Sequence, residues 1–108
     1  MNVQTTAHQI ELTDAIREHI DKRLTAALNQ HEQRVSSVEL RLEDLNAQKG
    51  GVDKLCRVTV NLKPRGTVVV EERGADLYLT ISHAADRVKA VVGRKLDRRE
   101  KKRRGVGR

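Results

Sequence analysis

Aromatic residues are almost absent from this chain of 108 residues. Phe and Trp do not occur, and Tyr78 is the only aromatic residue. A hydrophobic core must therefore be built from Val, Leu, Ile and Ala. The absence also excludes RNA-binding domains that stack bases on aromatic side chains of a β-sheet, because no segment with a strand pattern contains an aromatic residue.

Cysteine and long apolar runs are scarce as well. The single Cys56 cannot form an internal disulfide, and its place in an apolar strand pattern suits a reducing compartment. The N-terminus lacks a basic region followed by an apolar run, and no segment approaches the ~20 apolar residues of a membrane span. We therefore expect a cytoplasmic protein that makes no contact with a membrane.

Motifs for metal binding and catalysis are also missing. The four histidines lack the spacing of metal ligands, and one cysteine cannot build a zinc site. Gly-rich phosphate loops and triad-type nucleophile motifs do not occur. Gly50-Gly51 matches part of the Gly-Gly-Gln motif of release factors, but Val52 stands in place of the glutamine. We predict no metal, no cofactor, no small-molecule substrate and no enzymatic activity.

Charge is distributed unevenly along the chain. Residues 87–108 hold eleven of the 22 Lys and Arg and two acidic residues, which gives a net charge of +9. The rest of the chain holds eleven Lys and Arg and thirteen acidic residues, a net charge of −2. A basic segment on a mildly acidic body is typical of a protein with a polyanionic partner, and nucleic acid fits better than an anionic membrane surface. A charged tail that only aids solubility is the alternative.

Hydrophobic periodicity predicts one α+β domain with the order β-α-β-β-β-α. The expected strands cover about 3–8, 38–43, 56–63 and 67–72, and the expected helices about 14–29 and 77–104. We expect a four-stranded, antiparallel-type sheet with two helices on one face and water on the other. Thr13 and Asp76 are expected to cap the helices. Residues 1–104 form the predicted domain and 105–108 a short basic tail.

The second predicted helix gathers cations on one face. Arg87, Arg94, Arg98 and Lys101 follow one another at steps of seven, four and three. Arginine binds phosphate through bidentate hydrogen bonds, and each neutralised phosphate releases counterions, so this face is expected to bind the backbone of structured RNA with steep salt dependence. Beyond Lys95 the helix is charged on every side, and its last turns are expected to project or fray.

Two separated stretches carry a resemblance to a known family. Residues 8–18, HQIELTDAIRE, place an acidic and an apolar residue before Thr-Asp-Ala. The second stretch begins at Asp76-Leu77-Tyr78 and continues through Asp86-Arg87 to Lys102. They resemble the entry to helix one and the Asp-Met-Tyr motif with its basic second helix in the ribosome hibernation promoting factors and ribosome-associated inhibitors, historically called sigma-54 modulation proteins.

The resemblance implies a double-stranded-RNA-binding-domain-like fold that occupies the decoding region of the small ribosomal subunit. There it would occlude messenger RNA and the anticodon ends of tRNA, and so inhibit translation sterically. The implied partners are the small subunit, its ribosomal RNA and the whole ribosome, in stress or stationary phase, with a monomer off the ribosome. The chain resembles a short form of the family.

The resemblance also extends to individual positions. Asp76 and Tyr78 match the family's motif, and Arg23, Arg87, Arg94 and Arg98 fall where the family has Lys or Arg. With the neighbouring cations of the two helices, the expected RNA-binding residues are Arg23, Arg87, Arg94, Arg98, Lys22, Lys95, Arg99, Lys101 and Lys102. On the first helix, however, acidic residues lie among the cations, so an ordinary ion-paired surface is an equal alternative there. Tyr78 is expected to plug the core with its hydroxyl on a backbone partner, and RNA contact is the alternative.

Two other functions are compatible with the sequence. One is a regulator that acts through protein contacts, for example with the transcription apparatus, with the basic tail only assisting. The other is a peptidyl-tRNA hydrolase-like factor, against which the missing glutamine after Gly51 counts.

Overall fold

The computed structural model describes residues 2–45 and 53–106, with side chains as far as Glu100. The chain follows the predicted order β-α-β-β-β-α, with one short 3-10 helix added. The elements are β1 (Asn2–His8), α1 (Asp14–Leu28), η1 (Asn29–Arg34), β2 (Val35–Asp44), β3 (Lys54–Leu62), β4 (Thr67–Gly74) and α2 (Leu77–Val106). The predicted turn with Gly50-Gly51, the last two residues of the tail, and the side chains of Lys101 and Lys102 lie outside the described part.

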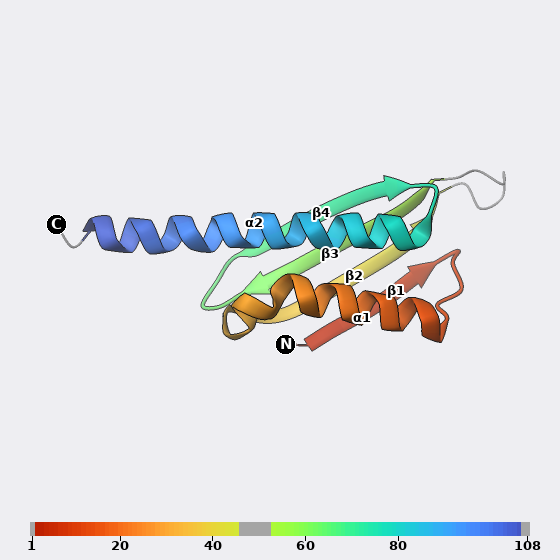
Figure 1. Cartoon of the computed structure of the whole chain (residues 1–108), viewed down its shortest axis with the longest axis horizontal. Coiled ribbons are helices and arrows are strands. Elements are labelled where there is room, and N and C mark those ends of the chain that lie inside the picture. Colours follow the sequence, from red (N-terminus) through yellow and green to blue (C-terminus); the bar gives the residue numbers. More distant parts are fainter. Residues whose placement is uncertain (1, 46–52, 107–108) are drawn as a thin grey trace.

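The four strands form one mixed sheet in the order β1-β2-β3-β4. β2 pairs antiparallel with β3, and β3 with β4, but β1 runs parallel to β2. The expectation of an antiparallel-type sheet is therefore wrong for the β1–β2 pair. The reason is that α1 crosses over the sheet between these two strands, and a crossover connection returns the chain to the end where it began (Figure 1).

Both helices lie side by side on one face of the sheet, as predicted (Figure 1). The core fills the space between the two layers and consists of aliphatic side chains. The strands contribute Val35, Val38, Leu40, Leu42, Cys56, Val58, Val60, Leu62, Val68 and Val70. The helices contribute Ile16, Ile20, Leu24, Leu28, Ile81, Val88, Val92 and Leu96. The four-residue spacing in α1 and the period of two in the strands thus identified the buried faces correctly.

The two predicted helix caps are confirmed. Thr13 Oγ1 accepts a hydrogen bond from Ile16 N at 3.2 Å, and Asp76 Oδ1 accepts one from Leu79 N at 3.1 Å. In addition, Thr80 Oγ1 donates to the Asp76 carbonyl oxygen at 2.7 Å. Asp76, which was expected as part of a family motif, therefore caps the start of α2 and accepts from a free backbone N–H of its first turn.

Some boundaries differ from the predicted ones. β2 begins at Val35, before the expected start at 38. The apolar alternation did not predict these first residues, because an irregularity in the register between Val35 and Ser37 interrupts it. β4 continues to Gly74, beyond the expected end at 72. α2 runs for 30 residues and extends well past the end of the sheet, which confirms the expected projection (Figure 1). The overall extents of 59 × 22 × 18 Å reflect this overhang.

Candidate nucleic-acid interface

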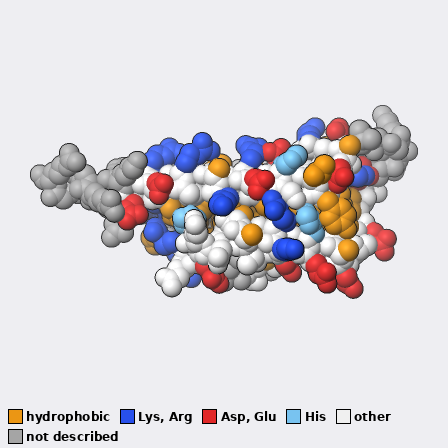
Figure 2. Space-filling view, viewed as in Figure 1, with side chains coloured by type: hydrophobic (Ala, Val, Ile, Leu, Met, Phe, Trp, Pro, Cys, Tyr) orange, Lys and Arg blue, Asp and Glu red, His pale blue; other side chains and the backbone are white. Residues whose placement is uncertain are grey.

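The outer face of α2 is the part of the predicted RNA-binding surface that faces water. Arg94 and Arg98 are exposed there, and Lys22 is exposed on α1. Neither arginine has an ion-pair partner among the residues whose side chains are described. Figure 2 shows Lys and Arg side chains along α2 and between the helices, with acidic side chains among them. These two guanidinium groups are therefore available to phosphate oxygens.

Arg87 and Lys95 turn from this face toward the edge of the sheet. Arg87 Nη1 donates to the Glu71 carbonyl oxygen at 2.9 Å and lies 3.4 Å from Glu72 Oε1, and Lys95 Nζ donates to the Thr67 carbonyl oxygen at 3.2 Å. β4 is an edge strand, and its outward carbonyl groups need donors that no further strand supplies. Both cations thus protect the edge of the sheet as well as adding positive charge.

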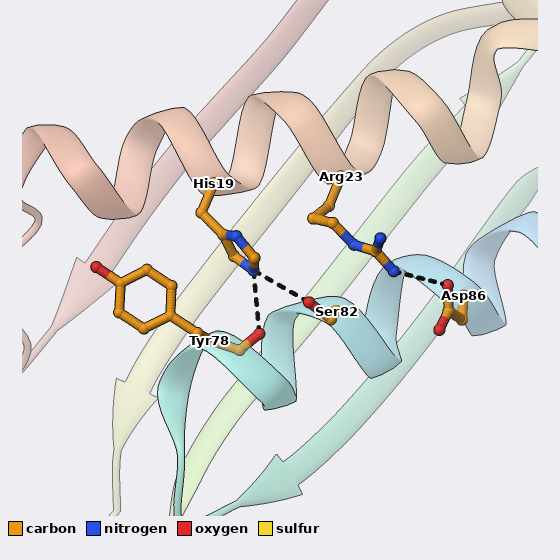
Figure 3. Close-up of polar contacts among 5 residues, drawn as sticks. All are labelled: His19, Arg23, Tyr78, Ser82 and Asp86. Carbon is orange, nitrogen blue, oxygen red and sulfur yellow. Dashed lines mark hydrogen bonds and ion pairs between the residues drawn. The ribbon is translucent and has the colours of Figure 1, made fainter.

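Arg23 joins the two helices instead of standing free. Its Nη2 lies 2.9 Å from Asp86 Oδ1, so an ion pair connects α1 to α2 (Figure 3). The Arg23 side chain is 35% exposed and that of Asp86 68% exposed. Arg23 Nε is buried without a hydrogen-bond partner in the described structure. The positive charge of Arg23 is therefore largely neutralised within the protein.

A groove of about 540 Å³ lies beside this ion pair, between η1 and α2. Its lining residues are Gln30, His31, Asp86, Lys89, Ala90, Gly93, Arg94 and Asp97. A side chain at Gly93 would meet His31 Nε2, which lies 3.9 Å from the position of a Cβ atom. The groove thus offers two cations and two carboxylates, so its acidic residues partly offset its attraction for a polyanion.

The expectation that Tyr78 plugs the core is wrong. Its side chain is 42% exposed, and its ring meets His19 edge-on with centroids 5.0 Å apart (Figure 3). His19 Nε2 donates to the Tyr78 carbonyl oxygen at 3.1 Å and lies 3.1 Å from Ser82 Oγ. Leu77 and Ile81 pack on the core from this part of α2, so the helix turns Tyr78 toward the surface of α1.

Titratable and nucleophilic groups are few in the described interior. No cluster of three or more His, Cys, Asp or Glu residues that suits a metal ion occurs among residues 2–45 and 53–100. Burial, with a smaller contribution from the Glu72 carboxylate, raises the pKa of the Cys56 thiol from 9.0 to about 12. No helix in the described ranges is long and apolar enough to cross a membrane.

Three cations outside the predicted set lie near Lys95 and Arg99. Lys63 and Arg65 belong to the turn between β3 and β4, over which α2 passes, and Arg34 contacts this turn. The basic composition of this turn is visible in the sequence. Its proximity to Arg34 and to α2 is not, because these parts of the chain are far apart in sequence.

Residues 3–102 match the family model described as "Sigma 54 modulation protein / S30EA ribosomal protein". The chain belongs to this family. This confirms the resemblance carried by residues 8–18 and by the motif that begins at Asp76. The family consists of non-enzymatic, ribosome-associated factors, in agreement with the prediction that the chain is not an enzyme.

Individual relatives agree with this assignment. The chain is 31% identical over 91 residues to the chloroplast ribosome-binding factor PSRP1 of Spinacia oleracea, and the match covers 81% of the chain but 28% of that protein. The Protein Y N-terminal domain of Thermus thermophilus superposes with a TM-score of 0.73 at 29% identity, covering 87% of this chain and 98% of that one. A ribosomal subunit interface protein from Coxiella burnetii, at 16% identity, shares the fold with a TM-score of 0.78, covering 90% and 99%.

Proposed function

We propose that this protein binds the small ribosomal subunit through the outer face of α2, occupies the decoding region and inhibits translation by excluding messenger RNA and tRNA. The observation that carries the proposal is the pair of exposed arginines, Arg94 and Arg98, which have no ion-pair partner among the described side chains and lie on a helix that extends past the end of the sheet. The family of the chain supports the ribosome as the partner, as do the names of its relatives, a ribosome-binding factor and a subunit interface protein.

The chemistry of this surface favours the backbone of folded RNA over base recognition. The strands carry no aromatic residue on which a base would stack. Guanidinium groups on a rigid helix hold phosphates in fixed positions, and the gain from counterion release makes the affinity fall steeply with salt. A protein bound in this way acts by occupying space, which agrees with a family of non-enzymatic factors.

The remaining parts of the proposal concern the setting in the cell. The partners are ribosomal RNA of the small subunit and the whole ribosome, and the protein is a cytoplasmic monomer when it is not bound. Its inhibition preserves idle ribosomes in stress or stationary phase. Residues 1–104 form the ribosome-binding domain.

The test compares two double variants that lower the net charge equally. Arg94→Gln/Arg98→Gln removes two cations from α2, and the control Arg41→Gln/Arg73→Gln removes two exposed cations from the other face of the sheet. Sedimentation with small subunits is measured over a range of salt concentrations, next to a translation assay. Losing two phosphate contacts should reduce the salt slope by about 2 and weaken binding about tenfold or more at low salt.

The control should lose much less binding and inhibition than the α2 variant. A regulator that acts through protein contacts would leave the α2 variant and the control equally active. Equal ribosome binding by both variants would therefore contradict the proposal.

A further inference from the structure

Five cations lie in or beside the turn between β3 and β4, over which α2 passes. We call them the turn cluster: Arg34, Lys63, Arg65, Lys95 and Arg99. Arg34 Nε donates to the Lys63 carbonyl oxygen at 3.4 Å, and Lys95 Nζ donates to the Thr67 carbonyl oxygen at 3.2 Å. Side chains from the end of η1 and from the second half of α2 thus meet the backbone of the turn.

The backbone of the turn holds this cluster in place. Lys63 N donates to the Arg34 carbonyl oxygen at 2.8 Å, and Leu62 N donates to the Gly66 carbonyl oxygen at 2.8 Å. Gly66 has a φ of +109°, which side chains rarely allow, and the Arg99 guanidinium group occupies the space that a Cβ atom would need. The absence of a side chain at Gly66 is therefore what lets Arg99 lie against the turn.

None of the five cations is neutralised by a carboxylate in the described structure. The ion pairs between described side chains lie elsewhere, and they include those of Arg23 with Asp86 and of Arg87 with Glu72. Arg99 Nη1 is buried and has no acceptor within the described residues. Five positive charges without carboxylate partners thus lie around one turn, and a polyanion that binds here is attracted by all of them.

The turn cluster is separate from the outer face of α2. Arg94 lines the groove beside η1, whereas Lys95 and Arg99 reach the turn. The turn also lies at the end of the sheet beyond which α2 projects (Figure 1). The projecting segment continues in sequence with Lys101, Lys102, Arg103 and Arg104. The turn cluster therefore lies where the helix leaves the sheet, next in sequence to a basic segment.

We propose that the turn cluster is a second phosphate-binding site, which holds an RNA backbone segment in the angle between α2 and the β3–β4 turn. The proposal rests on the proposed function in that it takes RNA as the ligand, and it adds Arg34, Lys63 and Arg65 to the contact surface. The site binds phosphodiester groups without base recognition. Together with the outer face of α2, it grips RNA from two directions and so fixes the orientation of the protein on its target.

The test uses Lys63→Gln/Arg65→Gln, because both side chains are exposed and their removal leaves the core intact. Arg41→Gln/Arg73→Gln is again the control with the same change in net charge. Binding to a fluorescein-labelled RNA stem-loop and to small ribosomal subunits is measured at several salt concentrations. The turn variant should lose about 2 in salt slope and bind about tenfold more weakly at low salt, whereas the control should lose much less.

The outcomes separate this site from the proposed function. If the turn variant binds like the control while Arg94→Gln/Arg98→Gln is weakened, the second site is refuted and the proposed function stands. If the unaltered protein does not bind small subunits but the turn variant loses affinity for the stem-loop, the site stands and the proposed function fails. Binding to phosphatidylglycerol vesicles that depends on the turn, with no such dependence for RNA, would overturn the site as an RNA contact.

Discussion

Replacing Asp86 with Asn should strengthen RNA binding, although it removes an ion pair from the protein. Asp86 neutralises Arg23 at 2.9 Å and also lines the groove between η1 and α2. The substitution removes one negative charge from this surface and leaves the charge of Arg23 without a carboxylate that neutralises it. The effect on affinity and the effect on stability should therefore have opposite signs.

The loss of stability should be small. Two unit charges 2.9 Å apart attract each other by about 1.4 kcal/mol in water, and ordering two side chains offsets much of this. Because the Asp86 side chain is 68% exposed and the amide of Asn can still accept a hydrogen bond, the cost should be about 0.5 kcal/mol. The gain in RNA affinity should be about threefold to tenfold at low salt, with a salt slope steeper by about 1.

Fluorescence anisotropy with a labelled RNA stem-loop measures the affinity, and urea unfolding measures the stability. Glu39→Gln is the matched control, because it makes the same change in net charge at an exposed position on the other face of the sheet. An Asp86→Asn variant whose RNA affinity equals that of the control, or falls below that of the unaltered protein, would show that Arg23 and the groove do not contact RNA.

Three further predictions concern stability and reactivity. Asp76→Ala removes the cap of α2 and should cost about 1 kcal/mol in urea unfolding, whereas Asp76→Ser should recover most of it. Tyr78→Ala should cost less than about 1.5 kcal/mol, because the ring is 42% exposed, and a loss of 3 kcal/mol or more would return Tyr78 to the core. Cys56 should resist iodoacetamide at pH 8 until the protein is unfolded, because folding raises the pKa of its thiol from 9.0 to about 12. For the same reason, its contribution to stability should decline as the pH rises above 9.0. Rapid labelling of the folded protein, or unchanged stability above that pH, would contradict this.

The arrangement of elements could be predicted from the sequence because its apolar pattern is simple. Val58, Val60 and Leu62 alternate with polar residues, and Ile16, Ile20 and Leu24 recur every four positions, so each buried face follows from the spacing alone. The direction of β1 could not be predicted in this way, because an alternating pattern is the same for a parallel and an antiparallel strand. The capping roles of Thr13 and Asp76 were predictable because they depend on local chemistry.

The candidate site was predictable only in part. Helical spacing placed Arg94 and Arg98 on one face, but it does not show what a long side chain reaches. Arg87 and Lys95 find carbonyl groups on the edge of β4, and these partners depend on tertiary packing. The turn cluster could not be predicted for the same reason, since Arg34 and Lys63 meet only in the folded sheet.

A competition experiment on the small subunit tests the central claim most directly. Subunits are first loaded with messenger RNA and tRNA, and the bound fraction of the protein is then compared with that on empty subunits by sedimentation. Occupation of the decoding region predicts that preloading lowers binding strongly and that the protein, when added first, prevents loading. Equal binding to loaded and empty subunits would place the protein elsewhere on the ribosome and contradict steric exclusion as its mode of action.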